Sequence, residues 1–186
     1  MIPIRNIYYM LAYAYQILQE KGYASLATEP FSNTADLLSA ILVRGVSIQI
    51  KRGLYKSYLP ENDLLSCPRG KISVSESVKR QSLSRQTLYC TYDVFSVNSY
   101  PNRILKSTMM LLLRSDIPAS RKKDLRRLLP YFVDAQLLYQ NEIQWNFRYD
   151  RNNQSYRMLL SICWLIWKGL LQMTTDGSTK LMEFLD

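Results

Sequence analysis

The chain has 186 residues, a formal net charge of +9 and 47% hydrophobic residues, and only the basic charge is unusual for a globular protein. Its longest apolar run, residues 158–167, contains Ser161 and is too short to cross a bilayer, which needs about 20 residues. Three scattered cysteines without any histidine make a poor zinc site, which needs about four ligands. The odd cysteine count and the absence of an apolar leader predict free thiols and a cytoplasmic location.

The first third of the chain predicts two helices joined by a loop. The first helix is expected over residues 5–21, with Gly22 as its stop signal. Ser32 or Asn33 can cap a second helix that runs to about Gly53, because a side-chain oxygen there accepts a hydrogen bond from the first turn. The apolar positions of this second helix predict that most of it is buried.

The middle of the chain predicts short strands. Residues 59–66 are short and bounded by Pro60 near the start and Pro68 after the end, and they are expected to form a strand or an extended edge. Residues 70–74 predict a second short strand, followed by a basic helical turn. Residues 88–97 are rich in aromatic and β-branched side chains and predict a third strand.

The second half is more clearly helical. Pro101 suits the start of a helix that ends near Ser115, and further helices are expected over residues 119–129 and 153–173. Residues 135–147 are ambiguous. Taken together, the pattern predicts an α+β fold that is mainly helical, with a few short antiparallel strands in a single compact domain. The helical aromatic residues are expected to lie in the core, namely Tyr8, Tyr9, Tyr13, Trp164 and Trp167.

The positive charge is concentrated in three segments, at residues 51–56, 79–85 and 121–127. Such clusters attract the phosphates of a nucleic acid. They suit an acidic protein partner equally well. Charge alone therefore leaves both classes of partner open.

Catalytic patterns are absent from the sequence. Glu76 and Asp93 are the nearest to a carboxylate pair, and both are explained more simply as structural residues. Gly70 and Lys71 lack the upstream glycines of a phosphate-binding loop. We therefore expect no catalytic residue, metal or cofactor site in this chain.

Several blocks of the sequence resemble, in the same order, the N-terminal region of the McrC family. McrC is the nuclease-bearing subunit of the McrBC restriction system, which cuts DNA containing modified cytosine. The blocks are IPIRNIYYMLAYAY at residues 2–15, RGLYKSYL at 52–59, RGKISVSESVKR at 69–80, YDVFSVNSYPNRILKSTMMLL at 92–112 and RNNQSYRMLLSICWLI at 151–166.

The resemblance implies a partner-interaction domain over residues 1–186. The partner is expected to be a McrB-like AAA+ GTPase hexamer, which binds GTP and is stimulated by the McrC-like chain. DNA is expected to be reached only through the complex, and no membrane is involved. In the family a PD-(D/E)xK nuclease domain follows this region, whereas here the chain ends just after KLMEFLD at residues 180–186.

In the family this region is implicated in docking into the central pore of the partner ring. A protruding basic element would suit that role, and residues 59–85 are our choice; the alternative is an ordinary surface hairpin. Arg103 and Lys106 belong to the resembling block at residues 92–112, where a helix is expected to start. They are interpreted either as part of an interaction surface or, alternatively, as members of surface ion pairs. The expected partner-binding residues are Arg69, Lys71, Lys79, Arg80 and Arg103.

Two functions from different classes follow. The first is a non-catalytic adaptor that docks on a GTPase ring. The second is a stand-alone basic nucleic-acid-binding domain, whose affinity would fall steeply with salt because binding releases counterions from the phosphates.

Overall fold

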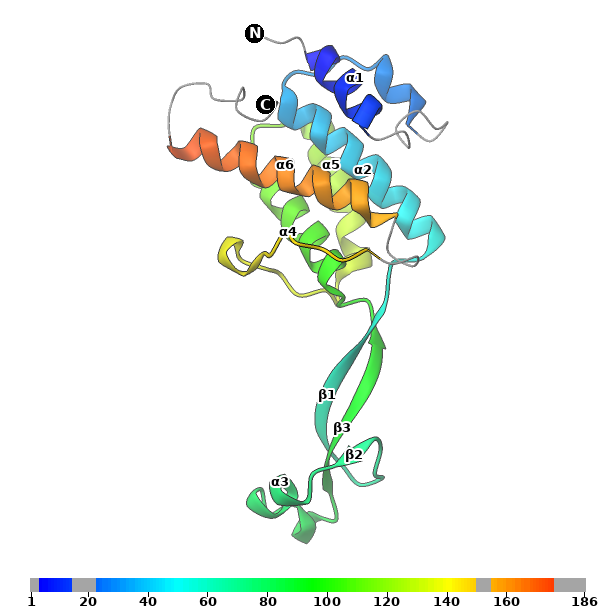
Figure 1. The fold of residues 1–186 in the computed structure, drawn as a ribbon, viewed down its shortest axis with the longest axis vertical. Coiled ribbons are helices and arrows are strands. Elements are labelled where there is room, and N and C mark those ends of the chain that lie inside the picture. The colour runs from blue at the N-terminus through cyan, green and yellow to red at the C-terminus, as the bar shows by residue number, and fades with distance from the viewer. Residues whose placement is uncertain (1–3, 15–22, 150–154, 176–186) are drawn as a thin grey trace. The chain divides into compact units, whose positions relative to one another are not determined.

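The computed structural model describes residues 4–14, 23–149 and 155–175 (Figure 1). The chain divides into two compact units. The helical unit comprises Met1–Tyr55 and Tyr100–Asp186, and the hairpin unit comprises Lys56–Ser99. The hairpin unit is thus an insertion between two parts of the helical unit. The α+β expectation, mainly helical with a few short antiparallel strands, is confirmed.

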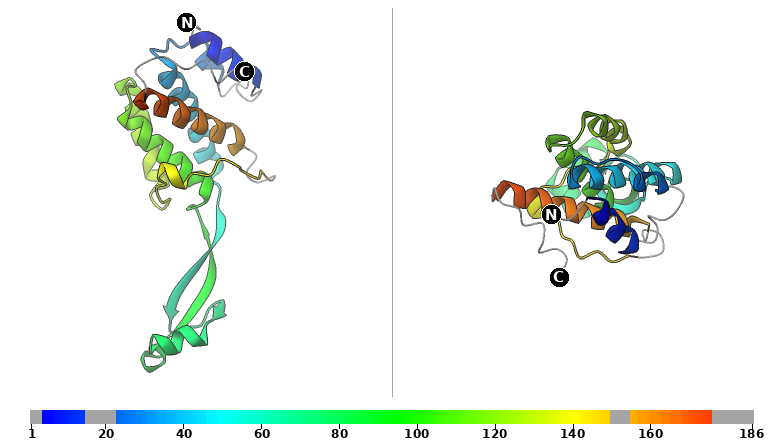
Figure 2. Two further views of the ribbon diagram at one scale, coloured as in Figure 1. Left: turned by 60° about the vertical axis from the view of Figure 1, so that its left-hand side comes forward. Right: turned by 90° about the horizontal axis from the view of Figure 1, so that it is seen from above.

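The helical unit contains five α-helices and three short 3₁₀ turns among its described residues. They are α1 (Ile4–Ala14), η2 (Ala24–Ala27), α2 (Thr34–Arg52), α4 (Tyr100–Arg114), α5 (Ala119–Leu128), η4 (Leu129–Phe132), η5 (Gln140–Glu142) and α6 (Tyr156–Thr175). Helix α6 packs on α2 and α4, α5 packs on α2, and α1 covers α2 (Figures 1 and 2).

Burial of apolar side chains from these helices forms the core of the helical unit. Helices α2 and α6 come close together at Gly45, where a Cβ atom would lie 2.2 Å from Leu159 Cδ2. The largest fully buried side chains are Leu37, Ile41, Leu42, Ile104, Leu105, Met109, Leu112, Leu125, Phe132, Tyr156 and Leu159. The regular spacing of these residues along α2, α4 and α6 explains why the sequence pattern predicted these helices.

The N-terminal aromatic residues are only partly buried. Tyr8 is 5% exposed, whereas Tyr9 and Tyr13 are 50% and 88% exposed, so the expectation of a core position is wrong for these two. Trp164 and Trp167 are half-buried, and Trp167 packs against the core. A helix that packs with one face leaves its other face in solvent, and aromatic composition alone does not reveal which face is covered.

Helix boundaries agree with the sequence signals wherever the structure describes them. The Asn33 side chain accepts a hydrogen bond of 2.8 Å from the Asp36 backbone N–H, which confirms the expected cap of α2. Helix α4 carries Pro101 in its first turn, as expected. The expected C-terminal part of the first helix and the first residues of the last helix fall in residues 15–22 and 150–154, outside the described residues.

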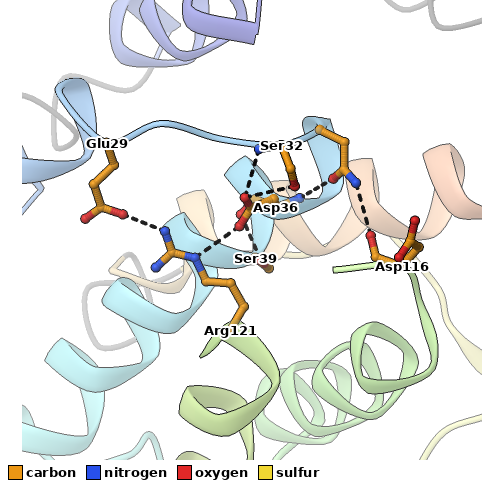
Figure 3. Close-up of polar contacts among 7 residues, drawn as sticks. Glu29, Ser32, Asp36, Ser39, Asp116 and Arg121 are labelled. Carbon is orange, nitrogen blue, oxygen red and sulfur yellow. Dashed lines mark hydrogen bonds and ion pairs between the residues drawn. The ribbon is translucent and has the colours of Figure 1, made fainter. Parts of the chain in front are cut away.

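A buried ion pair joins the start of α2 to α5 (Figure 3). The Asp36 carboxylate, 3% exposed as a residue, accepts hydrogen bonds from the Ser32 N–H and from Arg121 Nε at 3.0 and 3.1 Å. Arg121 also binds Glu29 through Nη2. Burial alone would lower the pKa of Arg121, but the bonds to Glu29 and Asp36 raise it overall. The loop before α2 is thereby attached to α5.

The hairpin unit is a long antiparallel ribbon that carries small elements at one end. Its elements are β1 (Ser57–Leu65), β2 (Lys71–Ile72), α3 (Val74–Lys79), η3 (Ser82–Arg85) and β3 (Leu88–Ser96). The sheet order is β1-β3-β2, and the β1–β3 register runs from Ser57 opposite Ser96 to Leu65 opposite Leu88 (Figures 1 and 2). The first strand continues through Pro60, because β1 is an edge strand and tolerates a missing N–H donor.

No described helix is long and apolar enough to span a membrane. All three cysteines are free, which confirms the expectation from their odd count. Cys67 is exposed, whereas Cys90 and Cys163 are buried. Burial also raises the pKa of the Cys163 thiol to about 12, so little reactive thiolate is present at neutral pH.

We therefore expect one cysteine thiol to be alkylated rapidly and the other two slowly. Under native conditions Cys67 should react with iodoacetamide as an exposed thiol does, and Cys90 and Cys163 at least about a hundredfold more slowly, because they react only after local opening. Time-resolved mass spectrometry measures the three rates. Equal rates, or a disulfide in the untreated protein, would contradict this arrangement.

Candidate functional site

The candidate site is the end of the ribbon at which β1 and β3 stop pairing. The tip, residues 66–87, follows the last β1–β3 pair and contains β2, α3 and η3 (Figure 1). It lies at the end of the ribbon opposite the two points where the chain enters and leaves the hairpin unit. The tip falls mainly within the segment 59–85 that the sequence favoured.

Two buried serines hold the tip together. Ser77 and Ser82 are 0% and 1% exposed. Ser77 Oγ donates to the Ser73 carbonyl at 2.9 Å and accepts from the Tyr89 N–H at 2.8 Å. Ser82 Oγ donates to the Ser77 carbonyl at 3.2 Å. These hydroxyls satisfy backbone groups that no strand partner reaches, so the tip folds around hydrogen bonds rather than an apolar core.

Gly70 brings the tip back onto β3. Its φ is +69°, and a Cβ atom there would lie 2.3 Å from the backbone oxygen of Thr91. Only glycine fits this position without moving β3. The turn allows Lys71 and Ile72 to pair with Thr91 and Cys90 as the third strand.

Five basic residues and a single acidic residue give the tip its charge. The basic residues are Arg69, Lys71, Lys79, Arg80 and Arg85, and the acid is Glu76. Four of the five expected partner-binding residues are thus brought together, and all four are exposed.

Two tip arginines are held against tyrosines of β3. The Arg69 guanidinium lies 4.4 Å from the ring centroid of Tyr92, and that of Arg80 lies 4.6 Å from the ring centroid of Tyr89. Tyr89 and Tyr92 are three residues apart on one strand, so they face opposite sides of the ribbon. Each side of the ribbon therefore carries a cation–π pair that restricts the arginine.

Glu76 partly neutralises the basic face of α3. Lys79 Nζ lies 3.0 Å and Arg80 Nε 3.7 Å from the Glu76 carboxylate oxygens. The hydrogen bond from Lys79 lowers the pKa of Glu76, and the charges of Lys79 and Arg80 lower it further. Lys71 and Arg69 have no such carboxylate among the described ion pairs.

Arg103 is not part of this cluster. It lies on α4 in the helical unit, and its Nε atom is buried without a hydrogen-bond partner among the described atoms. Its neighbour Lys106 donates to the carbonyls of Val133 and Ala135 at 3.2 and 2.7 Å, so the ion-pair alternative is wrong for Lys106. Arg103 and Lys106 therefore have different surroundings, although they lie close together in the sequence.

A buried polar network fixes the residue that precedes the hairpin. Asn102 Nδ2 donates to the Tyr55 carbonyl at 2.8 Å, and Tyr156 Oη donates to Asn102 Oδ1 at 3.0 Å. Tyr156 Oη also accepts from the Tyr55 N–H at 2.9 Å. Burial raises the pKa of Tyr156 to about 12, so its hydroxyl remains a donor at neutral pH. Both backbone groups of Tyr55 are thus satisfied by side chains of α4 and α6.

Sequence reasoning missed the apolar residues of the hairpin unit. Val74 and Val78 of α3 are 64% and 56% exposed. On the ribbon, Tyr58 and Phe95 are cross-strand neighbours with ring centroids 5.0 Å apart, and both are exposed. The spacing of the two valines, four residues apart on a helix with a charged opposite face, is the signal that could have revealed them.

The described residues contain no group of three or more His, Cys, Asp and Glu side chains placed to hold a metal ion. What the tip offers is a compact, ordered surface of basic and aliphatic side chains. Such a surface has the charge to attract an acidic macromolecule.

Comparison with known proteins relates most of the chain to one family. The sequence model described as "McrBC 5-methylcytosine restriction system component" matches residues 4–185. The Escherichia coli K12 protein "Type IV methyl-directed restriction enzyme EcoKMcrBC" is 30% identical over 98% of this chain. The chain spans 53% of that relative's length.

Two solved structures share the fold. One is the refined half-complex from a tetradecameric assembly of Thermococcus gammatolerans McrB AAA+ hexamers with bound McrC, with a TM-score of 0.68 and 16% identity over 87% of this chain and 40% of the other. The second is the cryo-EM structure of the T. gammatolerans McrBC complex, with a TM-score of 0.65 and 14% identity over 96% of this chain and 60% of the other.

Proposed function

Because the chain belongs to the McrBC family of 5-methylcytosine restriction system components, we propose that it is an McrC-type subunit that docks on a McrB-type AAA+ GTPase. In this proposal the tip of the hairpin unit enters the ring of the partner and stimulates GTP hydrolysis. GTP is bound by the partner, and this chain carries no cofactor and no nuclease site. DNA is reached through the assembled complex.

The observation that carries the proposal is the ordered basic tip. Its arginines are held by Tyr89 and Tyr92, and its backbone is fixed by Ser77 and Ser82. A surface that is already ordered loses less conformational entropy on binding than a flexible loop. The names of the similar structures support the choice of partner, because one describes McrB AAA+ hexamers with bound McrC and the other an McrBC complex.

Titration of a McrB-type GTPase from the same organism with the purified chain tests the proposal. The chain should raise the GTPase rate to a plateau, because a coupling free energy of roughly 1–3 kcal/mol between two sites changes turnover several-fold. Failure of the chain either to bind the ring or to change its rate would refute the proposal.

Charge reversal at the tip should weaken this response. In the quadruple variant R69E/K71E/K79E/R80E the half-saturating concentration is expected to rise at least about fivefold, because favourable contacts with acidic groups become repulsive. All four side chains are exposed, but Arg69 and Arg80 also lie over Tyr92 and Tyr89, so the alkylation rate of the buried Cys90 is measured beside circular dichroism to verify that the hairpin unit stays folded. A matched control, R126E/R127E on α5, changes exposed basic residues of the helical unit and should have less than about a twofold effect. If the quadruple variant stimulates the GTPase as well as wild type does, these four residues do not form the contact.

Salt separates this function from nucleic-acid binding. Binding to DNA through several phosphates weakens steeply between low and moderate salt. Docking that buries aliphatic side chains persists at moderate salt, because the hydrophobic contribution is not screened.

A further inference from the structure

We propose that the tip docks through the aliphatic face of α3, formed by Val74 and Val78, into a partner pocket with an apolar floor and an acidic rim. The inference rests on the proposed function, because the occupant is a pocket of the AAA+ GTPase. The inference specifies the chemistry of the contact, with two valines at its centre and the charged residues of the tip at its edge.

Helix α3 has two chemically different faces. Val74 and Val78 are four residues apart and therefore lie on one face. The opposite face carries Glu76 and Lys79, and Glu76 binds both Lys79 and the capping residue Arg80. The valines are 64% and 56% exposed, so within this chain they remain largely uncovered.

Two further aliphatic side chains of the tip, outside α3, are also exposed. Ile72 and Leu83 are 41% and 52% exposed. The interior of the tip is built from the hydroxyls of Ser77 and Ser82, so the fold of the tip makes little use of these aliphatic side chains. Large side chains that folding leaves exposed together on a small, ordered element are typical of a binding surface.

The combination of exposed aliphatic and basic side chains favours a protein as the occupant. Lys79 and Arg80 lie away from the apolar face and are paired with Glu76, and the tip carries three further basic residues and no other acid. An apolar centre with a charged rim is the arrangement of protein interfaces. A nucleic acid would favour open aromatic faces for stacking, whereas Tyr89 and Tyr92 are covered by arginines.

The variant V74T/V78T tests the role of this face. Threonine keeps the β-branched shape and replaces one methyl group of each valine by a hydroxyl group. The half-saturating concentration for binding and for GTPase stimulation should rise about tenfold or more, because two buried methyl groups are lost and two hydroxyls become desolvated. The matched control is V133T, at a 72% exposed valine of the helical unit, which should change the concentration less than about twofold.

Folding of the tip is checked in the same preparation. Cys90 is buried in the hairpin unit, so an alkylation rate equal to that of wild type shows that the hairpin remains folded. If the double variant fails this check, the single variant V78T replaces it, with an expected increase of about threefold, half of the double effect in free energy.

The possible outcomes separate the two proposals. Wild-type binding that V74T/V78T leaves unchanged overturns the valine contact and retains the proposed function. Absence of wild-type binding overturns both. Self-association or duplex-DNA binding of the wild-type chain that V74T/V78T abolishes, without an effect on ring binding, assigns the face to a second copy or to nucleic acid and overturns the proposal.

Discussion

Replacing Asn102 with alanine is expected to lower the free energy of unfolding by about 3 kcal/mol, because the buried Tyr156 hydroxyl and the Tyr55 carbonyl each lose a hydrogen bond at once. The Tyr55 carbonyl loses its donor, and Tyr156 Oη loses its acceptor. Asn102 is 0% exposed and Tyr156 is 1% exposed, so water cannot easily replace either bond.

Thermal unfolding followed by circular dichroism measures this effect. A loss of about 3 kcal/mol corresponds to a decrease in Tm of roughly 6–12 °C for a chain of this size. The matched control is Asn146→Ala, at an exposed asparagine of the helical unit, which should stay within about 0.5 kcal/mol of wild type. Equal Tm values for the two variants would show that the network contributes little.

The same network should make the free energy of unfolding depend on pH in the alkaline range. Burial raises the pKa of Tyr156 from 10.0 to about 12, so the folded state binds the phenolic proton more tightly than the unfolded state does. The resulting stabilisation is fully present below pH 10 and is lost as pH rises toward 12. This stabilisation arises from the Tyr156 hydroxyl group, so the substitution Tyr156→Phe should remove this part of the pH dependence.

Loss of Arg121 should be the second large effect. Arg121→Ala is expected to destabilise the protein by about 2–3 kcal/mol, because the buried Asp36 carboxylate loses its cationic partner. The two hydrogen bonds from Ser32 and the N-terminal end of α2 still favour the charged carboxylate, and this limits the loss. The contact with Glu29 is more exposed and adds less.

Urea unfolding of Arg121→Ala against Arg126→Ala isolates the ion pair. Both changes remove an arginine from α5, and arginine and alanine are similarly good helix formers, so helix propensity cancels. Arg126 is exposed, and its loss should cost less than about 0.5 kcal/mol. Similar midpoints for both variants would refute a stabilising role for the Arg121–Asp36 pair.

The helices could be predicted from the sequence because their signals are local. Asn33 caps α2, Pro101 opens α4, and apolar spacing marks the buried faces. The ribbon was harder to predict. Pro60 suggested the start of a strand, whereas β1 begins at Ser57 and continues through Pro60, which the sheet order explains because it places β1 at an edge.

The candidate site could be predicted in part, because part of it is also determined by local sequence. The basic residues at positions 69–80 are close in sequence, so their grouping follows from local structure. Arg103 was grouped with them by resemblance, whereas the fold assigns it to the other unit. The spacing of Val74 and Val78 indicates that they share one helix face, but the exposure of that face depends on Ser77 and Ser82 forming the interior of the tip in place of apolar side chains.

The central claim is that the tip of the hairpin unit contacts a McrB-type GTPase ring. Cys67 lies in the tip and is the exposed one of the three cysteines, so the wild-type protein already carries the site for a photoactivatable maleimide cross-linker. After illumination of the assembled complex, we expect cross-links from Cys67 to ring peptides that line the central pore, suppressed by excess unlabelled chain. A complex that forms fully but gives no Cys67 cross-link to the ring, or only cross-links to its outer surface, would contradict the account.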